Sequence, residues 1–279
     1  MAVDLIFWPF LAAVVISGIH VYLGLHVVTR GVIFVDLALA QVAALGTAVG
    51  VLWGLEPATT ASYLLAFLFT LIGAGLFAVI RSLPRAIPQE AIIGITYVVA
   101  AALMVLLFSR SPEGGEELNH LLVGSILFVT PQTVGKMFLL YLGIAWFHWT
   151  FRSRFLEASR NLGAATSEEG HRHTRWDFLF YVTFGIVVTL SVRVAGVLLV
   201  FSYLIIPIVA ALFFNRRPAA LLIFGWSFGL VASVLGMVFS LTLDLPTGAT
   251  IVVTFGLLLL LTAAVYLILP AVRNQRRSV

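Results

Sequence analysis

Two polar residues of the segment Gly31–Gly46 could do chemistry inside a membrane. Asp36 is the only carboxylate that lies inside an apolar run long enough to cross a bilayer, away from the ends of the run, and Gln41 follows five residues later. An ionisable group at membrane depth costs about 2.5 to 3.5 kcal/mol, so such groups usually mark a polar pathway or an internal ion pair. At 100° per residue the two side chains lie about 140° apart, so one helix cannot bring both to a single cation.

The two residues therefore have separate candidate roles. Asp36 either faces a translocation pathway and contacts a metal ion, or it is a helix-end anchor or a structural partner of Arg30 or of an arginine in a neighbouring loop. The carbonyl of Gln41 suits a hard cation, and its amide suits a hydrogen bond to another helix. Of these two roles for Gln41, we expect the interhelical hydrogen bond.

The spacing of the histidines does not predict a metal site. His20 and His26 are six residues apart, about 240° around a helix, so they cannot face one ion. We expect lone polar contacts, with His26 near the cytoplasmic interface. The segment Glu168–His173 holds acidic residues and histidines in a short run. We expect a solvated loop there, with a regulatory or exit-side metal contact as the alternative.

The composition is typical of a polytopic membrane protein. The 279 residues are 61% hydrophobic and 10% charged, whereas a soluble domain is about 25% charged. Cysteine is absent, so a zinc or manganese ion could have only histidine, carboxylate or carbonyl ligands. The net charge of +4 does not indicate nucleic-acid binding, because the basic residues are scattered over short loops between apolar spans.

The apolar runs predict an all-α, polytopic bundle of about nine transmembrane helices in one domain over residues 1–279. A bilayer core needs about 20 helical residues, and only helices or closed barrels satisfy their backbone there. The N-terminal run lacks a basic region and a cleavage site, so we expect a first membrane helix rather than a signal peptide. The predicted spans are 5–28, 31–54, 58–80, 90–108, 131–150, 176–192, 195–214, 219–242 and 248–269.

The distribution of basic residues predicts the orientation. With the N-terminus outside and the C-terminus inside, most of the 16 Lys and Arg residues fall in cytoplasmic segments. Merging the spans 176–192 and 195–214 across Arg193 would separate the basic C-terminal tail from Arg216 and its neighbour. The charge pattern therefore favours two spans.

Three shorter features complete the predicted architecture. The apolar segment 121–129 is too short to cross a bilayer, so we expect it to be re-entrant or interfacial. Pro207 should kink its span, because proline removes a backbone hydrogen bond. The cytoplasmic segment 151–175 predicts a short amphipathic helix that ends near Gly163, and the alternative is an ordinary connector.

Four sequence patterns, in order, resemble the metal-uptake class of ABC-transporter permeases, which import zinc, manganese or iron. The segment Gly31–Gly46 looks like the early signature helix of that class, and 121–131 is similar to its outer segment. The run Arg193–Ala211 resembles its best-marked helix, and Asp244–Thr250 resembles a turn before its last span. The resemblance implies the fold of type II ABC importer permeases in a bacterial plasma (inner) membrane, surrounded by membrane lipid.

The resemblance also implies partners. It implies a homodimer, one ATP-binding cassette subunit per protomer, and an extracytoplasmic metal-binding protein. ATP and Mg²⁺ would be bound by the cassette subunit, because Gly135-Lys136 lacks the flanking residues of a Walker A loop. This chain would then bind no cofactor, would not itself be an enzyme, and would translocate a divalent metal. The residues similar to the coupling motif are Glu157, Ala158, Asn161 and Gly163.

The second span departs from the pattern of that class. The class places Asp and His four residues apart, but this chain has Leu37 and Gln41 at those positions, with Asp36 displaced by one residue. The departure leaves the metal substrate open. The competing class is a secondary transporter or channel coupled through Asp36, although the two halves of the chain show no repeat that would favour it.

Overall fold

The computed structural model describes residues 2–56, 59–80, 88–109, 124–160 and 167–268. Helices dominate this part of the chain, and no strand occurs in it. The helices and one short 3-10 turn are α1 (Ala2–Arg30), α2 (Val35–Leu52), α3 (Thr60–Ile80), α4 (Gln89–Phe108), η1 (Ile126–Phe128), α6 (Pro131–Thr150), α7 (Arg152–Arg160), α8 (Ser167–Leu212), α9 (Pro218–Leu243) and α10 (Thr247–Ile268). The all-α prediction is confirmed.

The helices coincide with the predicted spans. Within the described residues, seven helices are long and apolar enough to cross a membrane. These seven helices include α8 once, although α8 contains two predicted spans. They do not include α6, which corresponds to the predicted span 131–150. The chain is a multi-pass membrane protein, while the number of crossings and the N-out orientation stay predictions.

Helix α8 is interrupted at Gly196, the second residue of the predicted span 195–214. Gly196 has φ 77° and ψ 160°, a left-handed region that glycine enters without steric cost. A break in a helix leaves backbone groups that need other hydrogen-bond partners. One such group is the carbonyl of Val194, which accepts a hydrogen bond from the N–H of Ser125 at 3.1 Å. Gly196 is the residue of α8 with non-helical backbone angles, and the kink at Pro207 stays a prediction.

The chain divides into two compact units. The first unit comprises residues 1–28, 123–138 and 194–279, and the second comprises 29–122 and 139–193. Helices α1, α6 and α8 each contribute residues to both. The prediction of a single domain over residues 1–279 is not tested by this division and stays a prediction.

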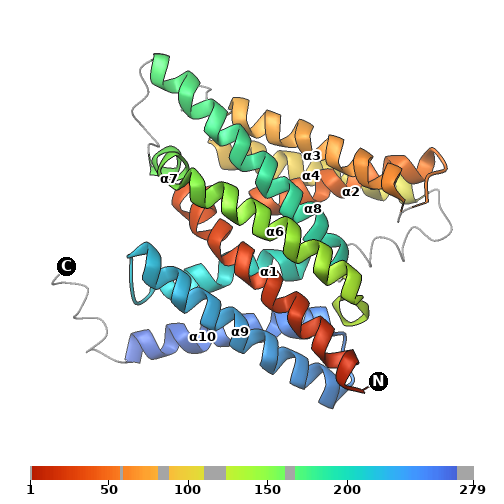
Figure 1. Ribbon diagram of the computed structural model, residues 1–279, viewed down its shortest axis with the longest axis vertical. Coiled ribbons are helices and arrows are strands. Elements are labelled where there is room, and N and C mark those ends of the chain that lie inside the picture. The colour runs from red at the N-terminus through yellow and green to blue at the C-terminus, as the bar shows by residue number, and fades with distance from the viewer. Residues whose placement is uncertain (1, 57–58, 81–87, 110–123, 161–166, 269–279) are drawn as a thin grey trace. The chain divides into compact units, whose positions relative to one another are not determined.

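The first unit is held by close packing of small residues. Helix α10 packs against α9 and η1, and α9 and α10 lie side by side in Figure 1. A hydrogen bond joins the hydroxyls of Tyr203 and Ser233, both of which are buried. Gly225 lies against Val21 of α1, which shows that a small residue of α9 serves packing inside the chain.

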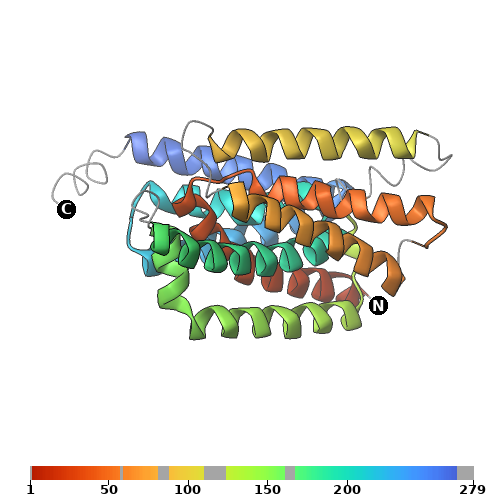
Figure 2. The ribbon, with the colours of Figure 1, turned by 90° about the horizontal axis from the view of Figure 1, so that it is seen from above.

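The second unit is organised around α2. Figures 1 and 2 show α3 and α4 beside α2, and α2 packs against both. Gly46 permits the closest approach, because a Cβ there would lie 2.9 Å from the Cα of Ala66 and 3.0 Å from the carbonyl oxygen of Leu65. Most of α2 is consequently buried, including its polar residues.

Candidate functional site

Asp36 lies in the first turn of α2, and the structure gives its carboxylate no partner. The residue is 0% exposed. Neither carboxylate oxygen accepts a hydrogen bond from any described residue. A negative charge in the first turn of a helix gains about 0.3 to 1 kcal/mol from the helix dipole, which offsets only part of the burial cost. Asp36 is therefore a buried acceptor that the described part of the chain does not satisfy.

Gln41, on another face of α2, is also a buried residue with an acceptor that the described part of the chain does not satisfy. It is 3% exposed, and its Oε1 has no hydrogen-bond partner among the described residues. The carbonyl thus makes no interhelical hydrogen bond within the described chain. The two residues remain about 140° apart on the helix. Their metal-contact and pathway roles stay predictions.

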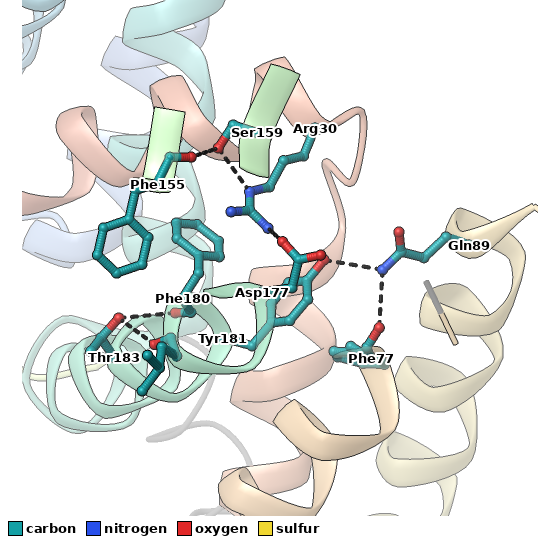
Figure 3. A network of polar contacts seen from close by, with 10 residues as sticks. Arg30, Phe77, Gln89, Phe155, Ser159, Asp177, Phe180, Tyr181 and Thr183 are labelled. Carbon is teal, nitrogen blue, oxygen red and sulfur yellow. Dashed lines mark hydrogen bonds and ion pairs between the residues drawn. The ribbon is translucent and has the colours of Figure 1, made fainter. Parts of the chain in front are cut away.

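Arg30 does not pair with Asp36. Its Nη1 instead contacts Oδ1 of Asp177 in α8 at 2.7 Å, and both side chains are almost fully buried (Figure 3). No described ion pair includes Asp36. The proposed structural pairing of Asp36 with an arginine is therefore wrong for the described residues. No local sequence pattern indicates the actual pair, because its members are 147 positions apart.

Arg30 also contacts α7, the short helix of the segment 151–175, which is predicted to be cytoplasmic. Its Nε donates to Oγ of Ser159 at 3.1 Å, and that hydroxyl donates to the carbonyl of Phe155 at 2.8 Å. The guanidinium carbon lies 4.0 Å from the ring centroid of Phe180. A guanidinium carries several donors in a fixed fork, so Arg30 can hold α7 and Asp177 together. Figure 3 shows these contacts converging on one side chain.

The amphipathic helix predicted for the cytoplasmic segment is confirmed as α7. Its inner face buries Phe155, Ala158 and Ser159, and the ring of Phe155 stacks on His148 with centroids 4.1 Å apart. Glu157 lies on the exposed face. Ala158 therefore packs inward, whereas Glu157 is accessible to a partner. Asn161 and Gly163 lie outside the described residues, and the coupling role of all four stays a prediction.

The polar contacts extend from α8 to α2, α3 and α4. The side-chain amide of Gln89 donates to the hydroxyl of Tyr181 at 3.0 Å and to the carbonyl of Phe77 at 3.3 Å (Figure 3). The neighbouring Glu90 accepts a hydrogen bond from the N–H of Phe34 at 3.1 Å. Phe34 is the N-cap residue of α2. One set of contacts thus reaches the end of α2 that carries Asp36.

A small cavity lies along the face of α2 that includes Asp36. Residues 36, 40, 43 and 47 recur at helical spacing on that face. The cavity measures about 10 Å³, room for about one water molecule at most. Its polar lining includes Thr47 and Arg193, joined by a hydrogen bond of 3.0 Å from Nη2 to Oγ1. Arg193, which lies between the predicted spans 176–192 and 195–214, therefore contacts α2.

The histidines are placed separately, as their spacing predicts. Nδ1 of His20 lies 2.9 Å from the carbonyl oxygen of Ile16, and the ring of His26 contacts that of Tyr22 edge-on. Among the residues whose side chains are described, no three His, Asp or Glu residues form a group that could hold a metal ion. The solvated loop expected at Glu168–His173 is wrong, because the backbone of this segment forms the start of α8. Its side chains are outside that part, and their metal contact stays a prediction.

Similarity to known proteins decides the family. A model of the ABC 3 transport family matches residues 2–266. The chain belongs to this family. A protein of Chlamydia trachomatis, named "Probable metal transport system membrane protein", is 27% identical over 168 residues. The aligned residues cover 60% of this chain and 57% of that relative. The chain thus matches little more than half of that relative's length.

Two further similarities span nearly the whole chain of this ABC 3 family member. The manganese import system permease protein ScaB of Streptococcus parasanguinis is 24% identical over 272 residues, 96% of this chain and 92% of that protein. The solved structure of PsaBC from Streptococcus pneumoniae in complex with Fab has a TM-score of 0.73 at 21% identity, with 94% of this chain and 95% of that chain covered. This structural likeness shows a shared fold.

Proposed function

We propose that this chain is the membrane-spanning permease subunit of a bacterial ABC importer that translocates divalent metal ions, manganese or zinc. The observation that carries the proposal is the family match over residues 2–266, which covers every described helix except the last residues of α10. The names of the similar proteins, metal transport and manganese import, support the substrate class. The chain works in the plasma membrane as a homodimer.

ATP is hydrolysed by a separate cassette subunit, because this sequence has no Walker A loop. A binding protein outside the membrane delivers the metal. The exposed face of α7, with Glu157, contacts the cassette subunit, and alternating access follows its closure. Asp36 contacts the metal substrate during translocation, because a buried carboxylate without a protein partner suits a hard divalent cation.

The test is reconstitution of the permease with its cassette subunit in vesicles and its binding protein outside. Uptake of Mn²⁺ and Zn²⁺ is measured with ATP, and with a cassette subunit that cannot hydrolyse ATP. We expect uptake that requires hydrolysis. Unchanged uptake with the inactive cassette subunit would contradict the proposal and would favour a secondary transporter or channel coupled through Asp36.

The role of Asp36 is tested in the same vesicles. Asp36→Asn should abolish metal uptake while the complex still assembles and hydrolyses ATP. The matched control is Asp244→Asn, because Asp244 is an exposed residue that ends α9 in the left-handed region, which asparagine also adopts. A loss of assembly in Asp36→Asn would mean that the carboxylate is structural, and uptake equal to that of the control would mean that the carboxylate is not needed for translocation.

A further inference from the structure

The contacts of Arg30 join α7 to the helices around α2, and no transport role is assigned to them by family membership or by similarity. We propose that Arg30 is the positioning residue that transmits the movement of α7 to α2, α3 and α4. The proposal rests on the proposed function, because α7 must receive its movement from a cassette subunit. It adds the side chain through which that movement reaches the segment containing Asp36.

The first step runs from α7 to α8 through one guanidinium. Nε of Arg30 holds Ser159 of α7, and Nη1 holds Asp177 of α8, at 3.1 and 2.7 Å. These two donors belong to one planar group, so a displacement of Ser159 changes the geometry at Asp177. Lysine has a single ammonium and cannot reproduce both contacts in the same arrangement.

The second step runs from α8 to α4 and α3. Tyr181 lies one helical turn after Asp177, and its ring is 5.8 Å from the guanidinium carbon of Arg30. Its hydroxyl accepts a hydrogen bond from Gln89 at the start of α4. The same amide donates to the carbonyl of Phe77 near the end of α3. The ring contact of Arg30 with Tyr181 therefore links Arg30 to the hydrogen bonds that join α8, α4 and α3, and Figure 3 draws those hydrogen bonds.

The third step reaches α2. Glu90 follows Gln89 in the chain and accepts the N–H of Phe34, the N-cap residue of α2. Asp36 lies two residues beyond Phe34. A shift of α4 is thus transferred by a hydrogen bond to the turn that holds the unpartnered carboxylate.

The energetics of the Arg30–Asp177 ion pair favour a role in positioning helices over a role in stabilising the fold. Taking two charges out of water is costly, and well-packed hydrophobic residues often stabilise a site as well as a buried ion pair does. What the pair adds is geometry, since a charged fork fixes the relative position of its partners. Helix α7 has nine residues and is too short to be stable alone. Its position therefore depends on side-chain contacts such as that of Ser159.

The test compares Arg30→Lys, Ser159→Ala and the double variant in the reconstituted transporter. The measured quantity is metal taken up per ATP hydrolysed, normalised to the assembled complex. We expect this ratio to fall about ten-fold in each single variant, the loss that corresponds to one charge-assisted hydrogen bond. The double variant should be no worse than Arg30→Lys, because both changes remove the same contact.

The matched control is Ser202→Ala in the first unit. Ser202 is buried and donates to the carbonyl of Leu198 at 2.8 Å, as Ser159 does to Phe155, and no hydrogen bond joins its hydroxyl to an arginine among the described residues. This control should keep the wild-type ratio. An unchanged ratio in Arg30→Lys and Ser159→Ala, with only the amount of complex reduced, would overturn the proposal. Additive losses in the double variant would overturn it as well.

Failure of the proposed function has a different result. If the unaltered transporter shows no uptake that depends on ATP hydrolysis, both proposals are overturned. If the unaltered transporter works and the variants keep its ratio of uptake to hydrolysis, only the role of Arg30 is overturned.

Discussion

Asp36 and Asp177 are buried carboxylates of the same compact unit, and they differ in what surrounds their charge. Asp177 contacts the guanidinium of Arg30 at 2.7 Å, whereas neither oxygen of Asp36 has a partner among the described residues. A paired charge holds elements of the fold in place, as Asp177 does for α8 and the end of α1. A buried carboxylate without a partner among the described residues would be stabilised by a bound cation. This property is expected of a group that contacts a transported metal.

The difference also has an energetic consequence. Removing one member of a buried ion pair leaves the other charge without compensation, so the loss is larger than the net contribution of the pair. Removing an unpaired buried carboxylate instead removes a desolvation cost. The two aspartates should therefore respond to substitution with opposite signs.

The largest expected effect is that of Asp177→Ala. This variant should lose about 3–5 kcal/mol in the free energy of unfolding, because Arg30 then remains buried without its partner. The measurement is denaturant unfolding of the purified permease in detergent. The double variant Arg30→Met/Asp177→Leu should recover most of the loss, since it leaves no buried charge. A double variant as unstable as the single one would mean that Asp177 acts by something other than pairing.

An intermediate effect is expected for Gly46→Ala, which tests whether close packing of α2 on α3 keeps Asp36 buried. The added Cβ would lie 2.9 Å from Ala66 and would force the helices apart, at a cost of about 1–3 kcal/mol in the free energy of unfolding. The control is Gly94→Ala on α4, where nothing lies within 4 Å of the added atom. That control should gain up to about 1 kcal/mol. Equal values for the two variants would contradict the close-packing explanation.

The smallest effect is expected for Asp36→Asn. In the same unfolding experiment it should gain about 1 kcal/mol, because a neutral amide is less costly to bury than a carboxylate. Together with the expected loss of uptake, this gain would separate function from stability at one position. A destabilisation as large as that of Asp177→Ala would contradict the view that Asp36 lacks a partner.

The coupling segment shows how far local sequence patterns reach. The helical spacing of apolar and small residues in the segment 151–175 predicted a short amphipathic helix, and α7 confirms it. Glu157 is exposed on this helix. It did not predict that Ser159 contacts Arg30, because the two residues are 129 positions apart.

Asp36 shows what local sequence patterns do not predict, namely which charged groups pair. Its position in an apolar run was readable from sequence, but the alternative that paired it with Arg30 rested on closeness along the chain. Arg30 ends α1, and the turn at 31–34 separates it from α2. The arginine side chain therefore extends from the end of α1 toward α8, where it contacts Asp177. Sequence proximity of charges is a poor guide to pairing when a turn lies between them.

The amino-acid sequence by itself determined the helical, membrane-spanning character of this chain, the location of its helices and its resemblance to metal-uptake permeases. Long apolar runs suffice for this, because a backbone in lipid must satisfy its own hydrogen bonds. Only the tertiary structure decided that Arg30 pairs with Asp177, that Asp36 has no partner among the described residues, and that α8 breaks at Gly196. These features depend on which distant side chains and carbonyls meet, and packing between helices decides that.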